Sequence, residues 1–96
     1  MICIKLFEKT GSFAENKDLA RNMRLTEIIP ALEKKQEVVL DFSNIDAVTQ
    51  SFIHALISDL IRKYGNEVLD LISFKSCNKT VKKIIQIVIE YMQESN

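Results

Sequence analysis

The sequence contains very little glycine, proline and cysteine, and it contains no tryptophan. Gly11 and Gly65 are its only glycines, whereas a phosphate-binding loop and a dinucleotide-binding fingerprint each need several glycines close together. These two kinds of nucleotide site are therefore excluded. Its two cysteines, Cys3 and Cys77, and its one histidine show no metal-ligand spacing. We therefore expect no cofactor and no metal, and we expect both thiols to be small buried side chains without a chemical role.

The chain also lacks an excess of charge of either sign and any long apolar run. Thirteen basic residues balance thirteen acidic ones, so no field of the whole molecule favours nucleic acid or an anionic membrane. No uncharged apolar run approaches the roughly 20 residues that cross a bilayer, and the first residues do not resemble a secretion signal. We therefore expect a cytoplasmic protein that binds neither nucleic acid nor membranes.

One local cluster of basic side chains departs from this balance. It consists of Lys75, Lys79, Lys82 and Lys83, and no acidic residue lies between Lys75 and Glu90. Such a cluster could hold an anionic partner or a phosphate, but it contains no aromatic or arginine side chain that would stack on bases. The pattern is more typical of a solvated helix face.

Apolar periodicity predicts a single domain, residues 1–96, in which three strands alternate with three helices. A chain of this length can bury one core and no more. The predicted strands are residues 2–7, 37–42 and 68–74, and the predicted helices are residues 17–35, 52–64 and about 80–93. The order βαβαβα predicts an α/β fold with a small mixed sheet of three to four strands and about three packed helices. The continuous apolar strand 37–42 is expected in the middle of the sheet, covered on both faces.

Several residues indicate where these helices begin, bend and end. Asn16 is a suitable N-cap for the first helix, which Pro30 must kink or restart. Gly65 is expected to end the second helix. Asn78 or Thr80 is expected to cap the last helix. The apolar stripe of that helix consists of Val81, Ile84, Ile85, Val88 and Met92.

Asp41 stands at the end of the predicted central strand, where open α/β sheets bind ligands and where receiver domains carry their phospho-accepting aspartate. A receiver also needs an acidic pair after its first strand to hold magnesium, but residues 7–9 contain only one acid. We therefore interpret Asp41 as a residue that caps the following turn, which contains Ser43 and Asn44. A small-ligand site that uses Asp41 stays as an alternative.

Ser51 and His54 lie three residues apart at the start of the second predicted helix, a spacing that suits a nucleophile and its base. A helical wheel places Ser51, His54, Ser58 and Arg62 together on the solvent side. No acid on that side would orient His54, and no glycine-rich turn would form an oxyanion hole. The pattern favours a solvated polar face with Ser51 or Thr49 as the N-cap, and a hydrolase-like domain stays as the alternative.

The segment from Val38 to Tyr64 resembles the signature of STAS domains, which are named after sulfate transporters and anti-sigma factor antagonists. Members typically have an apolar strand, Asp-Leu-Ser-Gly-Val, a short turn and then Asp-Ser-Ser-Gly at the start of a helix. Residues 41–45, Asp-Phe-Ser-Asn-Ile, stand for the first motif, and residues 49–52, Thr-Gln-Ser-Phe, stand for the second. The sequence is more similar still to a STAS-like family of short bacterial proteins of unassigned role, over residues 13–92.

This resemblance implies an interaction module and not an enzyme. In bacterial anti-sigma factor antagonists, the second serine of Asp-Ser-Ser-Gly is phosphorylated by a partner kinase that is itself the anti-sigma factor, and Ser51 occupies this place. Thr49 and Gln50 replace the aspartate and the first serine, while Phe52 and His54 replace glycines, which implies a bulkier docking surface. The implied partner is a histidine-kinase-type ATPase or an anti-sigma factor.

Two surfaces are expected to make contacts with proteins. The residues expected to bind the implied partner are Asp46, Thr49, Gln50, Ser51, Phe52, His54 and Ser58. On the last helix, Ile87, Ile89 and Tyr91 widen the apolar arc beyond what one sheet face needs. We therefore expect a weak homodimer or a partner groove there.

Overall fold

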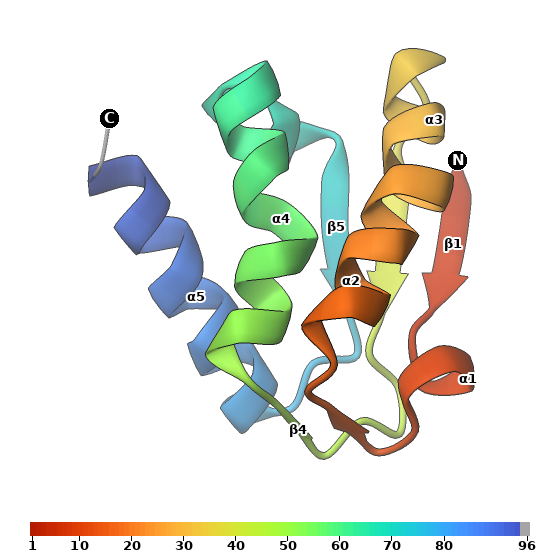
Figure 1. Ribbon diagram of the computed structural model, residues 1–96, viewed down its shortest axis with the longest axis vertical. Helices are drawn as coiled ribbons and strands as arrows, with labels where there is room; N and C mark the ends of the chain where they lie inside the picture. The colour runs from red at the N-terminus through yellow and green to blue at the C-terminus, as the bar shows by residue number, and fades with distance from the viewer. Residues whose placement is uncertain (95–96) are drawn as a thin grey trace.

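The computed structural model describes residues 1–94 and contains two small parallel sheets. The main sheet has the strand order β1-β3-β5, with β1 at Ile2–Lys5, β3 at Val38–Asp41 and β5 at Ile72–Lys75 (Figure 1). The second sheet pairs β2 (Phe13–Ala14) with β4 (Ala47–Val48). The expected α/β class and the central place of β3 are confirmed, but the main sheet is parallel throughout and not mixed.

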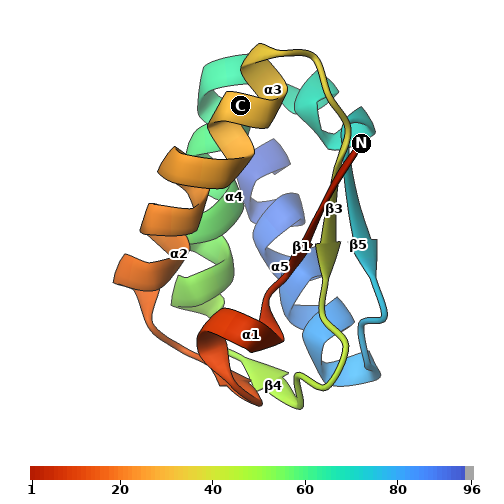
Figure 2. The same ribbon diagram turned by 90° about the vertical axis from the view of Figure 1, so that its right-hand side faces the viewer.

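The helical segments account for most of the remaining chain. They are α1 (Phe7–Thr10), α2 (Lys17–Met23), a π-helical turn (Arg24–Ile28), α3 (Ile29–Glu33), α4 (Gln50–Tyr64), a 3-10 helix (Asn66–Asp70) and α5 (Lys79–Glu94). Helices α2 to α5 lie on one side of the main sheet (Figure 2). The core lies between these helices and the sheet, and Phe42 and Phe52 are among its fully buried side chains. Within residues 1–94, no helix has the length and apolar character needed to cross a membrane.

The opposite face of the main sheet is open, so the prediction that β3 is covered on both faces was wrong. Strand side chains alternate between the two faces, and on the open face the register aligns Cys3, Val39 and Ser73. Val39 is only half-buried, and Cys3 is exposed. The expected burial of both cysteines was therefore also wrong, since Cys77 is half-buried.

The first and third predicted strands are shorter than expected, because helical turns replace part of each. After β1 the chain turns into α1 at Phe7, and residues 66–70 form a 3-10 helix before β5 begins. The amide of Val68 donates to the carbonyl of Gly65 at 3.2 Å, and that of Leu71 donates to the carbonyl of Val68 at 3.0 Å. Short apolar runs fit a buried strand and a buried helical turn equally well, so periodicity could not separate them.

The first predicted helix forms as three consecutive segments, which are α2, the π-helical turn and α3. Asn16 caps it as expected, since its Oδ1 accepts from the amides of Asp18 at 3.0 Å and Leu19 at 3.1 Å. Pro30 has no N–H to donate to the preceding turn. It is the second residue of α3, and the π-helical turn ends at Ile28, two residues before it. The expected disruption at Pro30 therefore takes the form of a widened turn, after which the helix continues as α3.

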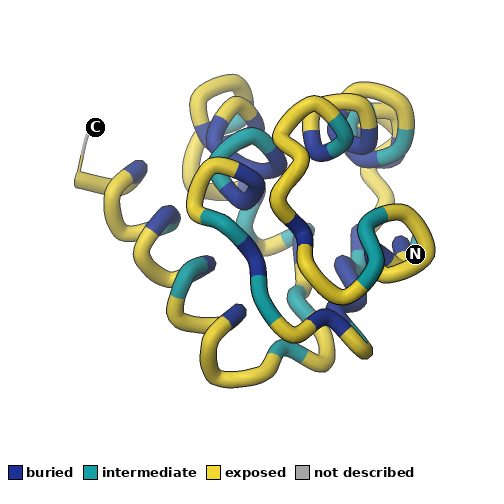
Figure 3. Tube along the Cα trace, turned by 60° about the horizontal axis from the view of Figure 1, so that its bottom comes forward, coloured by how far each residue is buried: buried dark blue, intermediate teal, exposed yellow. Residues whose placement is uncertain are grey.

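Helix α5 follows its predicted pattern closely. Asn78 is the cap, because its Oδ1 accepts from the amide of Val81 at 2.8 Å. The buried residues of α5 are Val81, Ile85, Val88 and Met92, and Figure 3 shows them on the side that faces the rest of the molecule. Ile84 and Ile89 are half-buried, while Ile87 and Tyr91 are exposed. Self-association through this exposed part stays a prediction.

Candidate functional site

The start of α4 is held in place by two neighbouring segments, residues 12–14 and the cap of α5. It lies at the same end of the molecule as the carboxyl ends of β1, β3 and β5 (Figure 1). The amide of Thr49 donates to the carbonyl of Ala14 at 3.0 Å, and the amide of Asp46 donates to that of Ser12 at 2.8 Å. The side chain of Asn78 donates to the carbonyl of Asp46 at 2.9 Å. Contacts from β2 and from the cap of α5 therefore fix the loop that leads into α4.

Ser51 lies in the first turn of α4 and is exposed. Thr49 is the N-cap, because its Oγ1 accepts from the amide of Phe52 at 3.1 Å. The hydroxyl of Ser51 lies 3.3 Å from the Thr49 hydroxyl. Of the two caps that the sequence left open, the structure selects Thr49, which leaves Ser51 without a capping role.

Replacing Thr49 by alanine is expected to lower the free energy of unfolding by about 0.5 to 2 kcal/mol, because the cap of α4 is lost. Ser51→Ala is the matched control, and we expect it to change that free energy by less than about 0.5 kcal/mol. Urea unfolding of both variants measures the difference. A larger loss of unfolding free energy for Ser51→Ala than for Thr49→Ala would show that Ser51, and not Thr49, caps α4.

Two residues that were expected to bind the partner are buried instead. Phe52 is fully buried, and only 2% of Ser58 is exposed. Phe52 was expected at the surface only because it replaces a glycine of the STAS motif. The helical wheel placed Ser58 on the solvent side because it assumed one covered side, but α4 lies between α2 and α5 (Figure 1) and packs against both. The exposed strip of α4 is therefore narrower than the wheel predicted, and neither residue belongs to an accessible surface.

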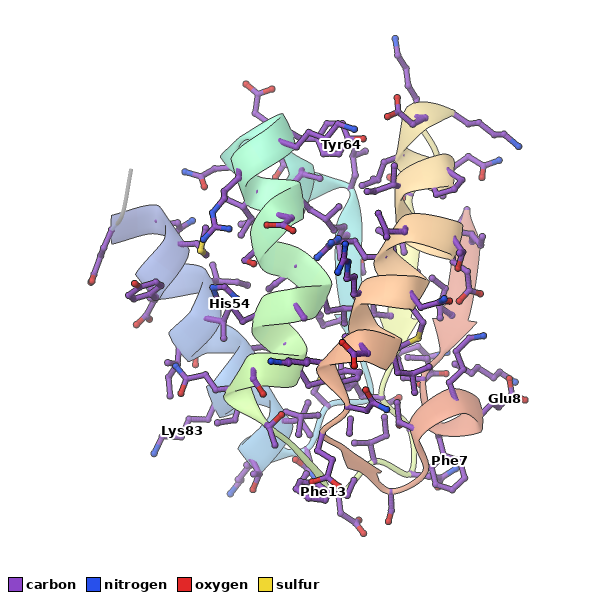
Figure 4. All side chains as sticks on the ribbon, in the orientation of Figure 1. Phe7, Glu8, Phe13, His54, Tyr64 and Lys83 are labelled. Carbon is purple, nitrogen blue, oxygen red and sulfur yellow. The ribbon has the colours of Figure 1, made fainter. Side chains whose placement is uncertain are left out.

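His54 is half-buried, and its hydrogen-bond partner is not the Ser51 of the hydrolase-like alternative. Its Nδ1 lies 3.3 Å from the hydroxyl of Ser58, and in Figure 4 it is labelled on α4 beside α5. The ring is thus held by a buried serine one turn further along the helix and not by Ser51. This geometry does not provide the nucleophile and base of the hydrolase-like alternative.

Phe13 is an exposed aromatic residue beside this site that was not predicted. It is 48% exposed and pairs with Ala47 in the small β2-β4 sheet, and Figure 4 shows it at the same end of the molecule. The only hint in the sequence that Phe13 belongs to the site was its place as a single aromatic residue in the mostly polar stretch after Gly11. The pairing that brings Phe13 near the start of α4 rests on strands of two residues, which periodicity cannot detect.

Asp41 caps the turn after β3, as expected. Its Oδ1 accepts from the amide of Ser43 at 2.9 Å and from the Ser43 hydroxyl at 2.5 Å, and Asn44 takes a left-handed conformation with φ of 68°. These two hydrogen bonds from Ser43 hold the pKa of Asp41 below its ordinary value. A cavity of about 420 Å³ lies beside the turn, between Asp41 and Phe7 of α1, so the small-ligand alternative retains a space to occupy.

The lowered pKa of Asp41 predicts a specific dependence of stability on pH. The hydrogen-bonded carboxylate stabilises the fold fully above the unfolded-state pKa of about 3.9, and this contribution is lost as the pH falls through the lower folded-state pKa. Asp41→Asn keeps an acceptor for Ser43 but does not titrate, so we expect it to lose less stability below about pH 4 than the wild type does. Urea unfolding at neutral and acidic pH tests this, and equal acid sensitivity of the two proteins would contradict it.

The basic cluster spans the end of β5 and the first turns of α5, and it is solvated. Lys75, Lys79, Lys82 and Lys83 are all exposed, and none of them forms an ion pair with another residue in the described part of the chain. Over the same residues, His, Cys, Asp and Glu side chains form no group that could hold a metal ion.

Comparison with known proteins identifies one family. A model of the family described as "STAS-like domain of unknown function" matches residues 25–82, a segment that includes β3, α4, β5 and the first turn of α5. Neither the curated proteins nor the solved structures contain a match. Since the matched segment is more than half of the chain and contains both the Asp41 turn and the start of α4, this chain belongs to the STAS-like family of unknown function.

Proposed function

We propose that this domain is a non-enzymatic regulatory module that binds a histidine-kinase-type ATPase or an anti-sigma factor. The partner would contact the exposed residues Phe13, Asp46, Gln50 and Ser51, which we call the α4 docking surface. Phosphorylation of Ser51 by the partner would control binding. The observation that carries this proposal is the position of Ser51, which is exposed in the first turn of α4 while Thr49 supplies the cap.

The start of α4 is a physically suitable place for a phosphate. A phosphoserine adds about −1.5 to −2 charges, and the amides of the first helical turn stabilise a nearby negative charge by roughly 0.3 to 1 kcal/mol. The fold would therefore tolerate the modification. A partner surface that matches a neutral serine would instead have to bury a charge, so the modification would act on docking and not on folding.

Phe13 supplies the apolar part of this surface. Aromatic side chains are enriched among the residues that contribute most to the stability of protein complexes, and Phe13 is exposed beside the loop that leads into Ser51. Phe52, which replaces a glycine of the related antagonists, lies in the core. It therefore does not enlarge the docking surface as the sequence comparison had implied.

Incubation of the domain with the cognate ATPase, ATP and magnesium tests the proposal. A histidine-kinase-type ATPase that is found to be encoded next to this gene would be the first candidate. Mass spectrometry should then find one phosphate on Ser51. The Ser51→Ala variant, which keeps the Thr49 cap, should remain unmodified. An unmodified wild-type Ser51 would remove the phosphorylation switch, and the absence of a complex as well would remove the interaction module.

A further inference from the structure

Strand β5 forms one edge of the main sheet, and one side of its backbone is unpaired. The amides of Val38 and Phe42 donate to the carbonyls of Leu71 at 2.8 Å and Lys75 at 2.9 Å. Backbone groups of successive strand residues point alternately to the two sides, so those of Ile72 and Phe74 point away from β3. Among residues 1–94 no strand lies on that side. Such an edge can pair with another extended chain.

A groove runs between this edge and α5. Helix α5 lies on the side of β5 away from β3 (Figure 1), and the groove has a volume of about 460 Å³. Phe74, Ile85 and Ile89 provide its apolar part, and Cys77, Lys82 and Gln86 lie along it. This volume falls within the range of pockets that bury an apolar group of a ligand. The groove therefore places a site for apolar side chains directly beside unpaired backbone.

The charges around the groove determine which chemistry it would accept. No acidic residue occurs from Lys75 to Ile89. The four lysines of the basic cluster are exposed and form no ion pairs within residues 1–94. An occupant with acidic side chains would neutralise these charges.

We propose that an extended segment of a partner protein, alternating apolar and acidic residues, pairs with β5 as a fourth strand. Its apolar side chain enters the groove of Phe74, Ile85 and Ile89, and an acidic side chain meets Lys82. Main-chain hydrogen bonds to Ile72 and Phe74 supply the pairing, as in other cases of β-strand addition. This second surface goes beyond the α4 docking surface and does not depend on Ser51.

A second copy of this chain fits the edge less well. A two-fold contact between two β5 edges would bring the same patch of each copy together, so Lys75 and Lys82 of both copies would face one another. The other sheet edge, β1, is also a less suitable place. Its neighbouring cavity is about 170 Å³ and has Glu27 and Lys34 of opposite charge in its lining.

Disulfide capture at Cys77 tests the proposal, because this thiol lies along the groove and detects weak binding. Cys3→Ser leaves Cys77 as the only cysteine. Three capped heptapeptides, each with one cysteine, are supplied as mixed disulfides with 2-mercaptoethanol. Capture is then a thiol–disulfide exchange, in which the Cys77 thiol bonds to the peptide sulfur and 2-mercaptoethanol is released, and free 2-mercaptoethanol sets the equilibrium. The first alternates valine and glutamate, the second has lysine for glutamate, and the third is the glutamate peptide with a proline at the position that would donate to β5. Burial raises the pKa of the Cys77 thiol and slows exchange, so capture is measured at equilibrium.

The glutamate peptide should be captured roughly two- to fivefold more than the lysine peptide and about two- to tenfold more than the proline peptide. Amide exchange at Phe74 should be slower in the glutamate conjugate than in the proline conjugate. Lys82→Glu, a change of an exposed residue, should reverse the order of the glutamate and lysine peptides. Equal capture of all three peptides, no capture, or unchanged exchange at Phe74 would overturn strand addition, and an unchanged order with Lys82→Glu would overturn the acidic partner.

Discussion

Replacing Phe52 by alanine is expected to lower the free energy of unfolding by about 3 to 5 kcal/mol. The side chain is fully buried between α4 and the sheet, so truncation removes its apolar contacts and leaves a cavity. Stabilities of small domains are only about 5 to 15 kcal/mol, so this variant should lie close to the limit of folding. Urea unfolding monitored by circular dichroism measures the change.

Phe13→Ala is the matched control for this prediction. The same truncation at a side chain that is 48% exposed should change the free energy of unfolding by no more than about 0.5 kcal/mol. The control also separates the two roles, because Phe13→Ala should weaken partner binding while the fold persists. A small loss for Phe52→Ala, similar to that for Phe13→Ala, would show that Phe52 is not packed in the core.

Ser51→Asp is expected to weaken binding of the partner ATPase at least about tenfold, which corresponds to roughly 1.4 kcal/mol. The added charge would be desolvated in the complex without a partner of opposite sign. The melting temperature should stay nearly unchanged, because the start of a helix accommodates a negative charge. Calorimetry measures the affinity, and thermal unfolding measures the stability.

Asn66→Asp provides the control for added charge. Asn66 is exposed at the opposite end of α4, in the 3-10 helix that follows it. The same change in net charge at this distance from Ser51 should leave affinity unaltered. Equal loss of affinity in both variants would indicate a general effect of charge. Unchanged affinity in Ser51→Asp would show that the partner does not bind at Ser51.

Features that depend on local chemistry were predictable from the sequence. Asn16 was predicted as a cap, while Asn78 and Thr49 were each one of two candidates. All three accept from amides two or three residues later, and such interactions are visible in a short stretch of sequence. The stripe of α5 and the central strand β3 follow from periodicity in the same way. The Asp41 turn was predictable because aspartate and serine side chains commonly bond backbone groups two residues away.

Features that depend on distant contacts were not predictable. Strands β2 and β4 have two residues each and exist only because they pair with one another. Ser58 is polar and was placed on the solvent side, but neighbouring helices on both sides of α4 bury it. The open face of the sheet likewise follows from all large helices lying on one side.

The candidate site likewise combines features that were predictable from local sequence with features that depend on distant contacts. The position of Ser51 in the motif came from the resemblance to STAS domains. The helical wheel predicted its exposure, which the structure confirms, and the choice of Thr49 as the cap came from the structure. Phe13 joins the site only through the β2-β4 pair, so no local pattern could have placed it there. His54 appeared to be a partner of Ser51 on a helical wheel, but its contact with Ser58 depends on how α4 packs.

Amide hydrogen exchange on the complex with the partner ATPase reports which residues the partner covers. We expect slower exchange at residues 12–14 and 44–54, around the α4 docking surface, and loss of this protection after phosphorylation of Ser51. Protection confined to the open face of the main sheet, or unchanged exchange at residues 44–54 in a stable complex, would contradict this expectation.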